Sequence, residues 1–291
     1  NADGRPILPI EAKELLKILK DIDEFGFIVP AHIWTPHFSL FGSNSGFDKI
    51  EDCFEELTDE IFALETGLSS DPEMNWRLSE LDKFSLISNS DAHSPSKLGR
   101  ECNIFYKKFD YKELISILKN KNFKMTIEYF PEEGKYHYDG HRNCGICFSP
   151  EETKKNNYIC PVCGRKVTVG VMHRVETLAD RKTGEKPQKY VPFKKIVPLE
   201  QIIGCVLNKE SSSQIVQKAY FDIVNKFGSE FYILIEADEK EFEGKLDTKI
   251  LEGIKKMREG NVNIKPGYDG EFGKVEILLD VGKIENQQTL F

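Results

Sequence analysis

The sequence predicts an α/β protein that continues into a four-cysteine metal module and a small α+β or helical C-terminal domain. Three observations support this fold class: helical patterns alternate with short apolar strands up to about residue 130, two C-x2-C pairs follow, and the pattern changes near residue 196. With 291 residues, 40% of them hydrophobic, the chain is long enough for two or three globular domains. We expect domains at 1–130, 131–195 and 196–282, followed by a tail at 283–291.

The first expected element is a helix. Apolar residues recur at helical spacing after Pro9, and the run stops at Gly26. Short apolar strands are expected at 27–29, 61–64 and 84–87, and the charged stretches around 52–57 and 76–81 are expected to be helical. Repeated helix and strand units of this kind indicate a parallel sheet or barrel.

Polar residues follow each of these strands: His32 follows the first, Glu65 the second, and Asp91 and His93 the third. The C-terminal ends of parallel strands lie on one face, so these side chains are expected to share a site. Imidazoles and carboxylates suit Zn2+ or Mn2+, and an Asp-x-His sequence places two ligands on the same side of an extended chain. Each residue alone could be a cap or a turn former, but the four together favour a metal site.

Four of the seven cysteines form two C-x2-C pairs separated by twelve residues, Cys144 with Cys147 and Cys160 with Cys163. Two such turns direct four thiolates toward one point, which is the arrangement of a structural Zn2+ site. Two disulfides are the alternative, but they need an oxidising compartment, and nothing in the sequence indicates export. His137 and His141 could be additional ligands, although four cysteines already complete a tetrahedron.

Charge is distributed unevenly. The net charge of −8 argues against a generally basic nucleic-acid coat protein, but residues 134–200 contain 13 Lys and Arg against 7 Asp and Glu. This basic segment could be a solvated surface or a binding surface for a polyanion. We expect no membrane partner, because no apolar run approaches the roughly 18 to 20 residues of a membrane span and the first residues lack the features of a signal peptide.

Two segments are candidates for contact with a nucleic-acid substrate. The loop at 34–47 contains three aromatic side chains expected to bind substrate, Trp34, Phe38 and Phe41. Their rings could stack on a base or wedge a duplex, or they could simply pack beneath the loop. The residues before the first cysteine pair offer hydrogen-bond donors for phosphate, Tyr138, His141 and Arg142.

The C-terminal region has a different pattern. We expect a helix after residues 211–213 that ends at Gly228, a strand at 231–235, a helix at 248–258 and, after a Gly-rich turn at 266–270, a final strand at 275–279. The tail resembles the short sliding-clamp-binding motifs of repair proteins, in which Gln287 would occupy a small pocket, and Leu290 and Phe291 a hydrophobic one. A frayed chain end is the alternative.

Several motifs together resemble a known family. The segments SNSDAHS at 88–94 and PAH at 30–32 resemble the later metal motifs of the PHP (polymerase and histidinol phosphatase) superfamily. More narrowly, the chain is similar to the endonuclease Q family in HIWTP at 32–36, FSLFG at 38–42, ETGLSSD at 65–71, YDGHRNC at 138–144, the four cysteines and PGYDG at 266–270. The resemblance covers nearly the whole chain.

The resemblance implies the C-terminal portion of a distorted PHP-type (β/α) barrel that holds two or three divalent metals, Zn2+, Mn2+ or Mg2+. His32, Asp91 and His93 would be ligands, Asp91 and His93 would form the catalytic pair, and Asp91 would also orient or deprotonate the attacking water. Glu65 would be a weaker ligand or only line the site. The PHP site begins with a His-x-His motif that this sequence lacks, so the N-terminal part of that domain is expected to be missing.

The activity that the resemblance implies is hydrolysis of a DNA phosphodiester on the 5′ side of a deaminated base, such as uracil, hypoxanthine or xanthine, or of an abasic site. Such a nuclease would act at the nucleoid, in the cytoplasm of a prokaryote. Two other functions stay open: a PHP-type phosphoesterase for a small substrate, and a catalytically incomplete DNA-binding fragment. Failure to bind DNA would favour the first, and salt-sensitive binding without cleavage would favour the second.

Overall fold

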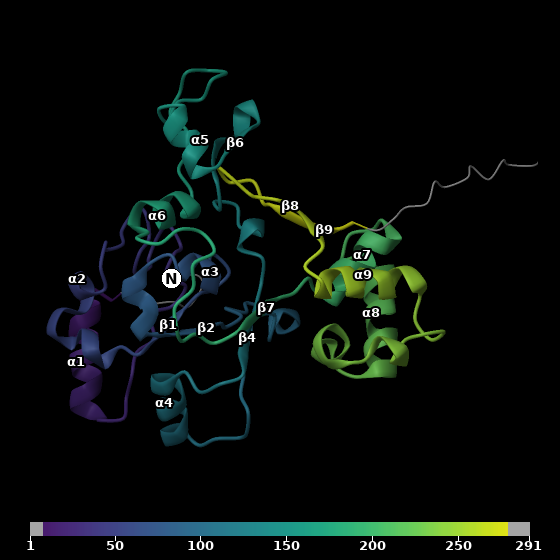
Figure 1. The fold of residues 1–291 in the computed structure, drawn as a ribbon, viewed down its shortest axis with the longest axis horizontal. Helices are drawn as coiled ribbons and strands as arrows, with labels where there is room; N and C mark the ends of the chain where they lie inside the picture. The colour runs from purple at the N-terminus through teal and green to yellow at the C-terminus, as the bar shows by residue number, and fades with distance from the viewer. Residues whose placement is uncertain (1–7, 279–291) are drawn as a thin grey trace, which may run out of the picture. The chain divides into compact units, whose positions relative to one another are not determined.

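The computed structural model describes residues 8–278, so the expected clamp-binding residues Gln287, Leu290 and Phe291 lie outside the described residues. The chain divides into two compact units (Figure 1). The first runs to Lys194 and takes in Pro266–Gly273, and the second comprises Lys195–Lys265 and continues from Lys274. Within the described part, no helix has both the length and the apolar character needed to cross a bilayer.

The first unit begins with the predicted helix, α1 (Ala12–Ile22), which buries Leu16 in the core. It packs beside the short helix α2 (Glu51–Phe54) and the 3-10 helix Glu55–Glu60 (Figure 1). The side chain of Lys13 bridges this contact, because its Nζ lies 2.6 Å from Glu55 and 2.8 Å from Glu56. The helical prediction around 52–57 is therefore confirmed, although half of the stretch is 3-10.

Two strands confirm the predicted parallel pairing. β1 (Ala63–Glu65) pairs in parallel with β2 (Ser85–Ile87), and Leu64 lies opposite Leu86. Leu64 packs in one apolar cluster and Ala63 in another, so both faces of β1 are covered, as parallel strands require.

The predicted strand at 27–29 is wrong. The segment has no ladder of its own, and Pro30 at its end has no N–H with which to extend one. Two hydrogen bonds hold the following residues beside β1 instead: the Glu65 N–H donates to the Pro30 carbonyl at 3.1 Å, and the Ile33 N–H donates to the Glu65 carbonyl at 3.2 Å.

The rest of this α/β region contains elements that sequence patterns left unassigned. A three-stranded sheet has the order β3 (Cys102–Ile104), β4 (Met125–Glu128) and β7 (Phe193–Lys195), and α4 (Tyr111–Asn120) lies between β3 and β4 in sequence. The helix expected around 76–81 is replaced by α3 (Pro72–Asn75) and the 3-10 helix Ser79–Lys83. Asp71 explains the early start, because its side chain caps the Met74 N–H at 2.8 Å.

The cysteine-containing module of the first unit is built on an antiparallel hairpin of β5 (Asp139–His141) and β6 (Ile146–Phe148). The 3-10 turn Arg142–Cys144 joins these strands, and α5 (Pro150–Lys155) and α6 (Val171–Leu178) follow. A capping box at Ser149 starts α5.

The second unit contains α7 (Leu199–Leu207), α8 (Gln214–Phe227), α9 (Thr248–Arg258) and the antiparallel pair β8 (Val262–Lys265) and β9 (Lys274–Ile277). The predicted helices at 214–227 and 248–258 and the last strand are confirmed. The strand expected at 231–235 is wrong, since Tyr232–Glu236 forms a π-helical turn. Arg258 accounts for it by donating to the carbonyls of Ile233 at 2.8 Å and Leu234 at 3.0 Å.

Candidate functional site

The ends of β1 and β2 bring together the loops that carry His32 and Asp91. Glu65, the last residue of β1, accepts the His32 N–H on Oε2 at 2.7 Å and the Asn89 amide on Oε1 at 2.8 Å. Asn89 lies in the loop that follows β2 and contains Asp91. Glu65 therefore connects the two loops through both of its carboxylate oxygens, whichever further role it has.

The backbone at this edge is strained. His32 has φ of 34° and Asp91 has φ of 42°, in the left-handed region that residues with a Cβ rarely adopt. Gly67 packs directly on His32, since a Cβ at Gly67 would lie 2.6 Å from the His32 Cβ. Strain of this kind persists only where the surroundings enforce it, and it concentrates at functional sites.

The four side chains expected to bind metal are of the right chemical types, imidazole and carboxylate, for Zn2+ or Mn2+. The ligand atoms of these four residues do not all lie within 4.8 Å of one another. Among residues 8–278, the one group of His, Cys, Asp and Glu side chains that meets this distance lies in the cysteine-containing module. The exposed His93 ring is held by its own loop, with Nδ1 2.8 Å from the Asp91 carbonyl oxygen. His93 is also absent from the lining of the cavity that His32 and Asp91 share.

That cavity has a volume of about 660 Å³, within the range of small-molecule sites, which is roughly 300 to 1,000 Å³. His32 and Asp91 line it together with residues from four further segments, 67–69, 131–137, 168–171 and Phe272. It is therefore large enough to receive part of a nucleotide next to the strained residues.

The aromatic loop divides into buried and exposed rings. Trp34 and Phe41 are 1% and 0% exposed, and their ring centroids lie 5.1 Å apart in the core. The Trp34 indole N–H donates to Asn75 at 2.8 Å. The expectation that these two residues bind substrate is therefore wrong. Phe38 is 80% exposed, with φ of 56°, and it remains a candidate.

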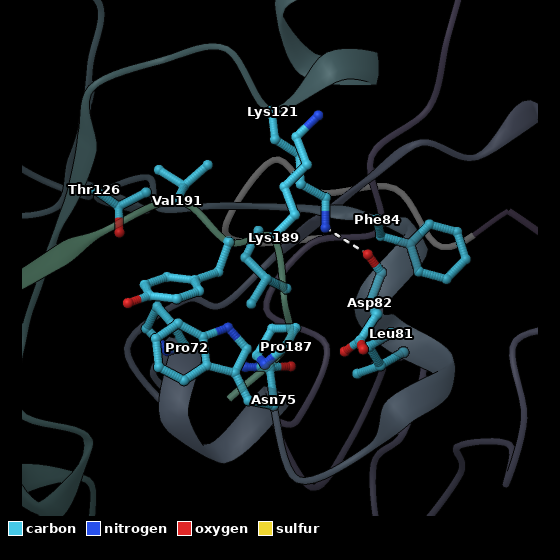
Figure 2. Close-up of a pocket in the computed structure, with 13 residues that line it drawn as sticks. Pro72, Asn75, Leu81, Asp82, Phe84, Lys121, Thr126, Pro187, Lys189 and Val191 are labelled. Atoms are coloured by element: carbon cyan, nitrogen blue, oxygen red, sulfur yellow. Dashed lines mark hydrogen bonds between the residues drawn. The ribbon is translucent and has the colours of Figure 1, made fainter. Parts of the chain in front are cut away.

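A second, smaller cavity lies behind β2 (Figure 2). Its volume of about 20 Å³ holds roughly one water molecule. Lys121 reaches into it and donates to the Asp82 carbonyl, and burial lowers the pKa of the Lys121 amine (Figure 2). The cavity is too small for a substrate.

The metal-binding group of the cysteine module consists of His141, Cys144, Cys160 and Cys163, whose ligand atoms all lie within 4.8 Å of one another. These side chains could hold a metal ion. Cys147 lies outside this group, so the ligand atoms that gather differ from the expected four-cysteine set. Cys147 belongs to β6, where it pairs with Gly140 of β5.

A repeated pattern explains this ligand set. His141-x2-Cys144 and Cys160-x2-Cys163 are each followed by a glycine in the left-handed region, Gly145 at φ 65° and Gly164 at φ 71°. Each of these glycines lets its turn close while two ligands face one point. The sequence indicated His141 only as an additional ligand beside four cysteines.

Protonation within the group is uneven. Burial would raise the pKa of Cys160, but hydrogen bonds from the backbone of Cys163 and Val162 lower it. Burial, followed by hydrogen bonds with Cys163 and Cys160, raises the pKa of Cys144 to about 11. Of these two thiols Cys160 loses its proton more easily, and thiolate is the form of cysteine that binds metals.

The expected phosphate-binding residues lie close to this group. His141 is one of its members, with Nδ1 3.8 Å from the Cys163 sulfur, so a metal bound at Nδ1 would leave only the Nε2 N–H to donate to a phosphate. Arg142 is exposed, and its backbone N–H donates to the Asp269 carboxylate at 2.8 Å. Tyr138 is half-buried against the His137 ring, at a centroid distance of 5.2 Å.

Two buried carboxylates near β1 were not found from the sequence. Glu128 is 0% exposed and accepts the Thr66 hydroxyl at 2.9 Å; burial raises its pKa to about 7, against the opposing effect of hydroxyl hydrogen bonds. Burial, and then the neighbouring Glu128, raise the pKa of Glu101 as well. The Glu101 Oε2 atom is buried without a hydrogen-bond partner.

Comparison with known proteins gives relatives for most of the chain. Residues 198–261 match the family model of the MJ0043 C-terminal domain. The protein MJ0043 of Methanocaldococcus jannaschii is 35% identical over 250 residues, which are 83% of this chain and 31% of that protein. YqxK of Bacillus subtilis is 30% identical over 270 residues, 90% of this chain and 64% of that protein. The chain therefore spans less than two thirds of either relative.

Solved structures match both the fold and the sequence. The lesion-specific endonuclease PfuEndoQ from Pyrococcus furiosus superposes with a TM-score of 0.84 at 29% identity, over 99% of this chain and 72% of that one. A structure of endonuclease Q with a 27-mer duplex that carries an abasic lesion at the active site superposes with a TM-score of 0.80 at 30% identity, over 98% of this chain and 72% of that one. The sequence identity and the shared fold together show that the chain belongs to the endonuclease Q family.

Proposed function

We propose that this protein is a DNA-repair endonuclease that hydrolyses the phosphodiester on the 5′ side of a damaged nucleotide. One observation carries the proposal: His32 and Asp91, both strained, line one cavity of about 660 Å³ in a member of the endonuclease Q family. The solved relatives include a lesion-specific endonuclease and a complex with an abasic duplex, which supports a DNA substrate.

The expected metal ligands are His32, Asp91 and His93, with Glu65 as a weaker ligand that also orients the loops through His32 and Asn89. Two or three bound divalent ions, Zn2+, Mn2+ or Mg2+, would supply hydroxide at neutral pH and stabilise charge on the phosphoryl oxygens. Asp91 would accept a proton from the attacking water or orient it, because Asp91 is one of the residues that line the cavity. The contact of His93 Nδ1 with the Asp91 carbonyl would leave Nε2 as the atom that binds the metal.

The proposed substrates are uracil, hypoxanthine and xanthine nucleotides and abasic sites. The Watson–Crick edge of a paired base is hidden inside a duplex, so the enzyme must extrude the nucleotide to bind it. Extrusion costs least at a mispaired base or an abasic site. The cavity is large enough to receive an extruded base, and Tyr136, Thr168 and Phe272 contribute to its wall.

The module at 131–195 is proposed as a structural zinc domain held by His141, Cys144, Cys160 and Cys163. Residues 1–130 would form the partial PHP domain, and residues 196–282 a C-terminal domain. The tail at 283–291 is proposed to bind a sliding clamp through Gln287, Leu290 and Phe291, which would keep the enzyme at the nucleoid of a prokaryotic cell.

A nicking assay tests this function. Labelled duplexes with one deoxyuridine or one abasic site are incubated with the protein and Zn2+, Mn2+ or Mg2+. We expect a metal-dependent cut 5′ to the lesion that Asp91→Asn abolishes and that Asp52→Asn, at an exposed site on α2, leaves intact. Hydrolysis of p-nitrophenyl phosphate without DNA cleavage would favour the small-substrate phosphoesterase, and salt-sensitive binding without any hydrolysis would favour a DNA-binding fragment.

A further inference from the structure

The loop Pro266–Gly273 belongs to the first unit, although the chain on both sides of it belongs to the second. Four backbone hydrogen bonds fix it to residues 132–138: Gly267 N–H to Glu132, Tyr138 N–H to Gly267, Gly270 N–H to Lys135 and Gly273 N–H to Glu133, at 2.8 to 3.0 Å. The Asp269 carboxylate adds two more, since it accepts the Thr168 hydroxyl at 2.6 Å and the Arg142 N–H at 2.8 Å. The loop is therefore a fixed part of the cysteine-containing module.

Phe272 is an exception within this well-bonded loop. Its side chain is 76% exposed, even though both neighbouring turns are anchored, and it lines the cavity that contains His32 and Asp91. A large apolar ring exposed on a fixed loop does not contribute to the core, and Phe272 instead forms part of a cavity wall together with Tyr136.

The surroundings of Phe272 are suited to a nucleic acid. The Lys135 Nζ lies 5.8 Å from the Phe272 ring centroid and 5.6 Å from the Tyr136 centroid. Both aromatic residues line the cavity, as does Lys135 itself. Aromatic faces next to a cation are the combination with which proteins bind unpaired bases and the adjoining phosphates.

We propose that Phe272 stacks on the extruded base of the damaged nucleotide, so that it acts as a base-recognition residue rather than as a wedge in the duplex. This inference rests on the proposed function. Stacking on a ring does not depend on base identity, because every base offers a π face, so Phe272 would contribute equally to uracil, hypoxanthine and xanthine. Lys135 would lie beside the backbone phosphate of the same nucleotide.

An abasic site separates this role from a wedge, because it has no base to stack on but leaves the same gap in the duplex. Fluorescence anisotropy would measure binding of the full chain to three labelled duplexes: undamaged, deoxyuridine and a tetrahydrofuran abasic analogue. We expect Phe272→Ala to weaken deoxyuridine binding by about 5- to 100-fold, the range for loss of one base–aromatic contact, and to change abasic binding less than about twofold. Phe272→Trp should restore binding.

Phe221→Ala serves as the matched control, since this phenylalanine is 56% exposed and lies in the second unit, outside the cavity lining. Circular dichroism would verify that each variant is folded. Equal losses on both lesions would replace the stacking role with a wedge or structural role, and an unchanged deoxyuridine affinity would overturn any role. If the wild type binds all three duplexes equally, the proposed function fails and the inference fails with it; if only the variant behaves unexpectedly, the inference alone fails.

Discussion

The backbone N–H of His32 donates a hydrogen bond of 2.7 Å to the Glu65 carboxylate at the end of β1. The second carboxylate oxygen accepts from Asn89 at 2.8 Å. Glu65 is only 8% exposed, so both hydrogen bonds form where water cannot easily replace them. A single buried side chain thus holds in register the two loops that carry His32 and Asp91.

Glu65→Gln should therefore lower the free energy of unfolding by about 1 to 3 kcal/mol. The NH2 group of the glutamine would face either the His32 N–H or the Asn89 amide, and two donors cannot form a hydrogen bond. Urea denaturation monitored by tryptophan fluorescence measures the change. Glu73→Gln is the control, since Glu73 is exposed in the first turn of α3. Equal effects of the two substitutions would show that Glu65 does not connect the loops.

Gly67→Ala should destabilise the protein by about 2 to 4 kcal/mol, because the new Cβ would meet the His32 Cβ at 2.6 Å and φ at Gly67 is 62°. Gly184→Ala separates the two causes, since Gly184 has φ of 89° but nothing within 4 Å of the added Cβ. Thermal unfolding of both variants would give the difference due to the His32 contact. Equal losses of stability in the two variants would show that the contact with the His32 Cβ contributes nothing measurable.

Sequence patterns predicted the elements whose apolar residues follow one period over many positions. α1, α8 and α9 are examples: α1 buries Leu16, α8 buries Val216 and Ile223, α9 buries five residues, and each ends near a glycine or a charged residue. The segment at 231–235 failed because five apolar residues suit a strand or a buried turn equally well. The observed turn is held in part by Arg258, more than twenty residues away in sequence, which donates to two of its carbonyls.

The site was predictable to the extent that chemistry follows strand ends. The parallel β1 and β2 pair placed Glu65 and the Asp91 loop on one edge, as expected. Burial was not predictable, so substrate binding and packing beneath the loop both stayed open for Trp34 and Phe41, and both residues lie in the core. No sequence pattern indicated that Glu101 and Glu128 are neighbours, because only the pairing of β3 with β4 brings them together.

The revised ligand set gives a paired test within one motif. Cys147→Ser should retain about one Zn2+ per chain, whereas Cys144→Ser should lose it, since only Cys144 lies in the group with His141, Cys160 and Cys163. Mass spectrometry of the metal in purified protein measures the content, and the melting temperature should fall only in the metal-free variant. Loss of zinc from Cys147→Ser at the same level would restore the four-cysteine set.

Glu128→Gln should stabilise the protein at pH 8 and have little effect at pH 5. Burial raises the pKa of Glu128 from 4.5 to about 7, so between these values the folded state retains a proton that the unfolded state has lost. Stability therefore falls as pH rises through that window, by up to about 3 kcal/mol, and stays low above it. Glutamine has no such titration, and its amide can still pair with the Thr66 and Thr126 hydroxyls, which donate or accept.

The same substitution also removes the charge that helps to raise the pKa of Glu101, so the gain at high pH should extend to that neighbour. Urea denaturation at pH 5, 6, 7 and 8 would compare the variant with the wild type and with Glu73→Gln. A stability difference that grows with pH supports a buried carboxylate that is protonated at low pH. A constant loss at every pH would instead mean that the Glu128 hydrogen bonds outweigh the cost of burying its charge, and the coupling between Glu128 and Glu101 would then have no measurable effect on folding.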